Sequence, residues 1–155
     1  MNDTNYALEW YRYGLNNQDD AIFRFMMHWI AFNWLYSEYR YDPDTSEKDA
    51  IREYCRVHYR ELSRFDAFST DAISVFLKEP VRDIVSGFVR SNGTRQFRLL
   101  RESEGLTRMT SLILTIYQVR CNLFHGSKSL RIERDLELVH ASAAIMEGYL
   151  RAVLS

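Results

Sequence analysis

The stretch AIFRFMMHWIAFNWLYSEY, residues 21–39, is the most apolar part of the sequence, and it decides the fold class. Apolar and aromatic side chains cover nearly the whole circumference of the helix that this stretch predicts, which is typical of a helix buried on all sides. Asp20 stands directly before it, where a residue that caps a helix is expected. We therefore expect residues 20–39 to form the central helix of a bundle.

Few residues that break helices interrupt the chain, which has 155 residues with only 2 prolines and 6 glycines. This composition favours long helices over a β sandwich with many tight turns. The sequence predicts an all-α fold, a single domain over residues 1–155 that forms an up-and-down type helical bundle of five to seven helices. Besides the central helix, we expect helices at residues 2–16, 46–64, 71–79, 94–106, 107–124 and 129–154, and a further short helical piece at 81–89.

The charged residues are nearly balanced, with 20 Lys and Arg against 21 Asp and Glu, so any binding of nucleic acid must be local. The two cysteines, Cys55 and Cys121, lack the spacing of metal ligands, and we expect free thiols and neither a metal nor a cofactor. No apolar run reaches the roughly 18 residues of a membrane span, and the first residues do not resemble a signal peptide. These features predict a cytoplasmic protein with no membrane partner.

Arg120 interrupts an apolar stripe on the helix predicted at residues 107–124. Met109, Ile113, Ile116 and Leu123 recur at helical spacing, and Arg120 occupies a position in the same stripe. A guanidinium group keeps its charge at ordinary pH, so it needs a carboxylate, an open cleft, a second subunit or a ligand phosphate. The alternative is that Arg120 lies at the edge of the stripe and extends its charged end into water.

His125 follows five residues later, directly before Gly126, which we expect to cap the end of this helix. On an ideal helix, Arg120 and His125 are separated by about 140° around the axis, so they do not share a face. They converge if the last turn unwinds toward Gly126, or if a symmetric second copy brings its own pair opposite. A histidine at a helix C-terminus can also simply bind the last carbonyl groups.

The string Arg120-Cys121-Asn122-Leu123-Phe124-His125 resembles the Arg-x4-6-His motif of the HEPN superfamily, whose members are often ribonucleases or toxins. The resemblance extends loosely to the whole chain through the size of the predicted helical domain and the aromatic second helix. The family commonly has a polar residue directly after the motif arginine. Here Cys121 occupies that position and Asn122 follows, so the resemblance implies that Asn122 supports the site.

This resemblance implies a metal-independent endoribonuclease with Arg120, His125 and Asn122 as its catalytic residues. It also implies a homodimer, an RNA substrate, and an antitoxin or a protein of a phage-defence system as a possible partner. The chemistry is coherent, because a histidine can move protons near neutral pH and an arginine can bind phosphate oxygens through two donors. A dimer would bring two His and two Arg together, enough for both proton transfers.

A local basic segment precedes the motif, and we expect it to bind the RNA backbone through Arg95, Arg98 and Arg101, with Lys128 after the motif. A solvated helix face explains the same residues equally well. A different class of function also stays open: a helical module without catalytic activity that binds a protein or a nucleotide, with Arg120 in a structural ion pair.

Overall fold

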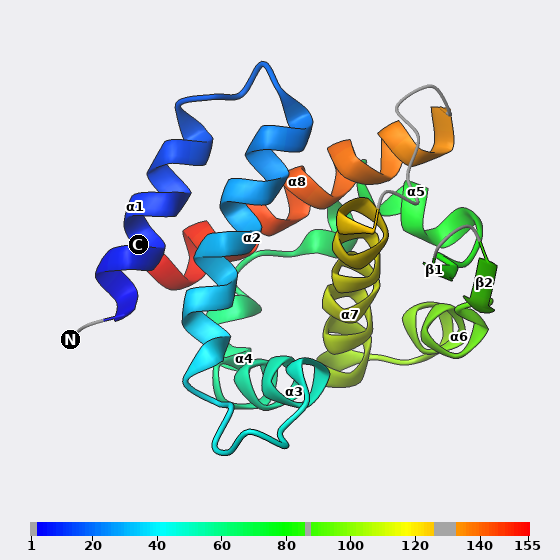
Figure 1. The fold of residues 1–155 in the computed structure, drawn as a ribbon, viewed down its shortest axis with the longest axis horizontal. Helices are drawn as coiled ribbons and strands as arrows, with labels where there is room; N and C mark the ends of the chain where they lie inside the picture. The colour runs from blue at the N-terminus through cyan, green and yellow to red at the C-terminus, as the bar shows by residue number, and fades with distance from the viewer. Residues whose placement is uncertain (1–2, 86–87, 126–132) are drawn as a thin grey trace.

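The computed structural model describes residues 3–85, 88–125 and 133–155, and it confirms the all-α prediction for them (Figure 1). These residues contain eight α-helices, one 3-10 turn and a two-stranded antiparallel sheet. In chain order the elements are α1 (Asp3–Leu15), α2 (Ala21–Ser37), α3 (Glu47–Val57), α4 (Tyr59–Leu62), the 3-10 turn η1 (Ala67–Ser69), α5 (Ile73–Lys78), β1 (Asp83–Val85), β2 (Phe88–Ser91), α6 (Thr94–Glu102), α7 (Gly105–Phe124) and α8 (Glu133–Leu154).

The helix α2 lies at the centre of the bundle, as its sequence predicts. Asp20 caps it, because the side chain accepts hydrogen bonds from the backbone of Ile22 and Phe23, both at 3.1 Å. It packs along α1, and α8 passes across both helices (Figure 1). The rings of Trp29, Phe32 and Tyr36 are buried on it, so aromatic contacts supply much of the core.

The count of eight helices exceeds the expected five to seven partly because the predicted helix 46–64 is divided. Ser46 begins it as expected, since its hydroxyl accepts a hydrogen bond from the backbone N–H of Asp49 at 3.0 Å. The backbone then leaves the helical conformation at His58, where φ is −103° and ψ is 19°. The segment therefore forms two helices, α3 and the single turn α4.

The prediction of a short helix at residues 81–89 is wrong, because this segment forms the strands β1 and β2. Ile84 pairs with Val89, and Val85 pairs with Phe88. Branched and aromatic side chains of this kind favour strands, and Ser86 and Gly87 stand between the two runs in the sequence. The pairing also depends on a contact with α7, described below.

Among the described residues, no helix combines the length and the apolar character that crossing a membrane requires.

His28 is a fully buried titratable residue on α2. Its ring lies between Tyr11 of α1, with ring centroids 5.5 Å apart, and Glu147 of α8, whose carboxylate is 4.0 Å away. Gly14 makes room for the ring, since a Cβ atom there would come within 2.8 Å of it. Burial, and then the charge of Arg24, lower the pKa of His28 to about 4.

We predict that the stability of the fold falls as the pH drops from about 6.5 to about 4. In this window the unfolded chain binds a proton at His28 and the folded chain does not. The free energy of unfolding is therefore lower by roughly 3 kcal/mol at pH 4 than above pH 6.5. Urea unfolding at several pH values measures the change. The profile of a His28→Gln variant should be shallower across this window, and an equal slope would contradict the assignment.

Candidate functional site

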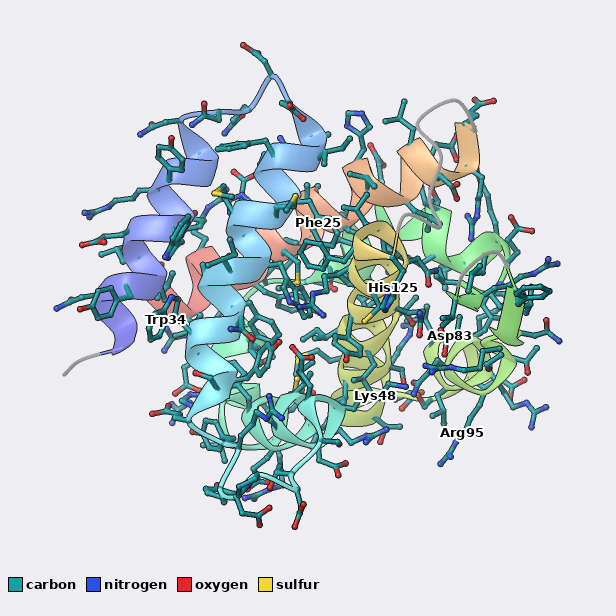
Figure 2. All side chains as sticks on the ribbon, viewed as in Figure 1. Phe25, Trp34, Lys48, Asp83, Arg95 and His125 are labelled. Atoms are coloured by element: carbon teal, nitrogen blue, oxygen red, sulfur yellow. The ribbon has the colours of Figure 1, made fainter. Side chains whose placement is uncertain are left out.

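The motif residues lie at the C-terminal end of α7, which stays helical through Phe124 as predicted. His125 is the residue that ends the helix, and its backbone N–H still bonds to the carbonyl of Cys121 at 3.0 Å. Its side chain is exposed (Figure 2). Gly126, which we expected to cap this helix, is outside the described residues.

Arg120 continues the buried stripe of α7, as its spacing predicts. Met109, Ile113 and Ile116 of this stripe are buried, and 27% of the Arg120 side chain is exposed. Its Nη1 lies 3.8 Å from the Oε2 atom of Glu47 in the first turn of α3. Its guanidinium carbon is 4.6 Å from the centroid of the Phe124 ring. A carboxylate and an aromatic ring therefore hold the charge of Arg120.

Glu47 links three elements at this point. It accepts a hydrogen bond from the hydroxyl of Tyr36 on α2 and another, at 3.1 Å, from the hydroxyl of Tyr117 on α7. Burial is the main cause that raises the pKa of both tyrosines, followed by Glu47 for Tyr36 and by Cys121 and then Glu47 for Tyr117, so both hydroxyls stay neutral donors. The carboxylate is thereby fixed beside Arg120.

The guanidinium of Arg120 keeps unused donors. The 3.8 Å separation from Glu47 is an ion pair and not a hydrogen bond. The Nε atom is buried and makes no hydrogen bond among the described residues. Its Nη1 has one weak contact with the sulfur of Cys121, also at 3.8 Å. The group is held in place, while the 3.8 Å contacts leave the N–H donors of Nη1 only weakly engaged on a side chain that is partly exposed.

Asn122 faces the opposite side of α7 and is fully buried. Its amide nitrogen donates to the carbonyl of Arg82 at 2.6 Å. Its amide oxygen accepts from the backbone N–H of Ile84 at 3.3 Å and from Gln118 at 2.9 Å. The side chain expected to act in catalysis therefore fastens β1 to α7, and any support that it gives to the site is through position.

A second carboxylate, Asp83, extends this network. It accepts a hydrogen bond from Gln118 at 3.3 Å and pairs with the guanidinium of Arg90 on β2 at 2.7 Å. Sequence reasoning missed both Glu47 and Asp83. In the sequence each is one acidic residue near an element start, and nothing in the local pattern distinguishes it from the solvated acids around it.

The structure does not bring Arg120 and His125 together through unwinding of the helix. Because α7 is regular up to Phe124, the two residues leave it in directions about 140° apart. Arg120 faces Glu47 of α3, whereas the helical spacing puts His125 on the same face as Gln118, seven residues earlier. Of the two routes to convergence considered from the sequence, only pairing with a second copy is compatible with this helix.

The three arginines expected to bind RNA, Arg95, Arg98 and Arg101, are exposed on α6. The guanidinium of Arg101 lies 5.4 Å from the ring of Phe97. In the view of Figure 2, Asp83 lies between His125 and Arg95. Lys128 is outside the described residues.

Comparison with models of known protein families, with curated proteins and with solved structures finds no match to this chain. Within the described part of the chain, no group of three or more His, Cys, Asp or Glu side chains is arranged to hold a metal ion. The geometry around α7 and the motif from Arg120 to His125 are therefore the features that indicate a function.

We predict that Asn122→Ala lowers the free energy of unfolding by about 1–3 kcal/mol, because it removes the buried hydrogen bonds of the amide with the Arg82 carbonyl and the Ile84 N–H. Urea denaturation measures the loss. Asn33→Ala is the matched control, since Asn33 is exposed on α2 and its removal should change stability by less than about 0.5 kcal/mol. Equal effects of the two substitutions would show that the Asn122 contacts are not structural.

Proposed function

We propose that this protein is a metal-independent endoribonuclease of the HEPN type, which cuts RNA at a site shared by two copies of the chain. One observation carries the proposal. Arg120 is partly exposed and its Nη1 atom makes only contacts of 3.8 Å among the described residues, and the exposed His125 ends the same helix. A fixed cation and an accessible imidazole are the groups that cleavage of a phosphodiester needs when no metal takes part.

Arg120 has the role of binding the phosphate. Glu47 and Phe124 restrict its position, so little ordering is needed when an anion arrives. Guanidinium N–H groups match the oxygens of a phosphate and stabilise the charge that grows on them during attack. Arg120 is therefore the electrostatic element of the proposed site.

His125 has the role of moving protons. One imidazole accepts the proton of the RNA 2′-hydroxyl while the 2′-oxygen attacks the adjacent phosphorus. The bond from phosphorus to the 5′-oxygen breaks, and a second imidazole gives that oxygen a proton. The products are a 2′,3′-cyclic phosphate and a 5′-hydroxyl end.

The second imidazole comes from a second copy of the chain. A single chain has one His125, and its Arg120 points to a different side of α7. A twofold axis beside the ends of the two α7 helices would set the His125 of one copy near the Arg120 of the other. The homodimer is thus part of the proposed mechanism.

The arginines of α6 supply the path for the RNA strand. Arg95, Arg98 and Arg101 are exposed, so each is free to contact phosphates of a bound strand. Lys128 has the same role in the proposal. The biological setting that we propose is a toxin or a phage-defence effector in the cytoplasm, with an antitoxin or defence-system protein as its neutralising partner.

The contact of Arg120 with Glu47 favours one alternative. If this ion pair is purely structural, the protein is a helical module that binds a protein partner or a nucleotide and has no catalytic activity. The two functions differ in what His125 does, because a structural ion pair between Arg120 and Glu47 does not involve it.

We predict that the purified protein cleaves RNA at neutral pH equally well with and without a chelator, leaving 2′,3′-cyclic phosphate ends. Arg120→Ala and His125→Ala should each lower the cleavage rate by a factor of about 10²–10⁴. Expression of the wild type should arrest growth of the host, and both substitutions should relieve the arrest. Gel analysis of RNA and growth curves are the two measurements.

His140→Ala and Arg12→Ala are the matched controls, since both side chains are exposed on other surfaces. They should cleave RNA as the wild type does. Intact RNA after incubation with the wild type, together with equal growth of all strains, would overturn the ribonuclease and favour the binding module.

A further inference from the structure

A small cavity lies between α6, α7 and the hairpin, on the side of α7 that faces away from Arg120. Its volume is about 80 Å³. Thr115 and Gln118 of α7 line it, together with Asp83 of β1, Gln96 of α6 and Lys48 of α3. Four separate elements of the chain therefore contribute these residues to one small space.

Two side chains with hydrogen-bond acceptors line the polar part of this cavity. Asp83 is one; only 14% of its side chain is exposed, and each carboxylate oxygen can accept a further hydrogen bond besides those from Arg90 and Gln118. Gln96 provides another, because its Oε1 atom is buried and has no hydrogen-bond partner among the described residues. A buried acceptor without a partner costs free energy, so it is best matched by a ligand that donates N–H groups.

Much of the remaining wall of the cavity is apolar, and its exposed edge is polar. Phe76, Leu100 and Leu114 are buried and form part of its wall. Lys48 and Ser91 also line it but are exposed, so they mark the side that opens to solvent. This combination suits a flat ligand whose N–H edge enters first and whose remaining polar groups meet Lys48.

The size of the cavity limits the ligand. A water molecule needs about 10–15 Å³ of such volume, so the cavity admits roughly five to eight non-hydrogen atoms. A pyrimidine base is at the upper end of this range, and a purine base exceeds it. Among pyrimidines, cytosine carries an exocyclic amino group that donates two hydrogen bonds, whereas uracil has a carbonyl group at that position.

We propose that this cavity binds a cytosine base of the RNA substrate, with the amino group of the base donating to Gln96 and Asp83. The assignment rests on the proposed ribonuclease function, which it deepens by naming a base preference. Gln118 lines the cavity and precedes His125 by seven residues, a distance of about 10 Å along the helix. The base would therefore belong to a nucleotide close to the phosphate that is cut.

The arrangement of the surface agrees with this assignment. Gln96, which lines the cavity, is flanked by Arg95 and followed by Arg98, both exposed on α6. A strand that contacts these arginines and reaches the end of α7 passes this cavity, because Gln96 of α6, Asp83 of β1 and Gln118 of α7 all line it. Phosphate contacts would position the strand, and the cavity would read one base.

The test is the binding of nucleotides that have no bond to cleave. Calorimetry with the full chain should show that cytidine 5′-monophosphate binds at least tenfold more tightly than uridine 5′-monophosphate or adenosine 5′-monophosphate. Gln96→Leu should weaken the binding of the cytidine nucleotide by about tenfold, and Gln96→Glu, which retains an acceptor, should restore it. Gln18→Leu is the control, since Gln18 is exposed beyond the end of α1.

The results separate this assignment from the ribonuclease itself. Cleavage of RNA without preferential binding of the cytidine nucleotide overturns the cavity assignment and leaves the ribonuclease standing. Preferential binding without cleavage supports the cavity assignment and overturns the ribonuclease. Equal binding of all three nucleotides, or unchanged binding by a folded Gln96→Leu protein, would overturn the cytosine site.

Discussion

The regular helical path of α7 up to Phe124 is the constraint on which the rest of the site depends. It directs Arg120 to one side of the bundle and His125 to another, although only four residues separate them in the sequence. Each side of α7 is then held by its own carboxylate. Glu47 fixes the side of Arg120, and Asp83 fixes the side of Gln118 and Asn122. Cooperation between the two motif residues therefore needs a second copy of the chain.

The two carboxylates have different relations to a ligand. Glu47 is already shared by two tyrosine hydroxyls and by Arg120, so its role is to hold the cation in place. Asp83 holds the hairpin through Arg90 and also lines a cavity that contains a buried amide oxygen without a partner. In the proposed enzyme, the first side of α7 binds the reacting phosphate and the second side selects a neighbouring base. Asn122 fixes the end of α7 next to β1, through its hydrogen bond to the carbonyl of Arg82.

Features that depend on local pattern could be predicted from the sequence, and features set by distant contacts could not. The apolar stretch of α2, its cap at Asp20 and the end of α7 follow from spacing and chemistry along a few turns. The position of Arg120 within a buried stripe follows from the same periodicity. The two strands are not predictable from residues 81–89 alone, because Asn122, some forty residues later, makes hydrogen bonds to the backbone of Arg82 and Ile84. The partnership of Glu47 with Arg120 escapes prediction for the same reason, since α3 and α7 meet only in the folded chain.

The most direct test of this account is to mix the wild type with the inactive His125→Ala protein. The proposed reaction uses one His125 from each copy, so a dimer that contains one chain of each kind lacks one of the two proton carriers. After the chains have been unfolded and refolded together with about a tenfold excess of the variant, RNA cleavage per wild-type chain should fall at least fivefold, because most wild-type chains are then paired with the variant. Cleavage per wild-type chain equal to that of the wild type refolded alone, in a mixture shown to contain dimers of both chains, would show that the two copies do not share the site.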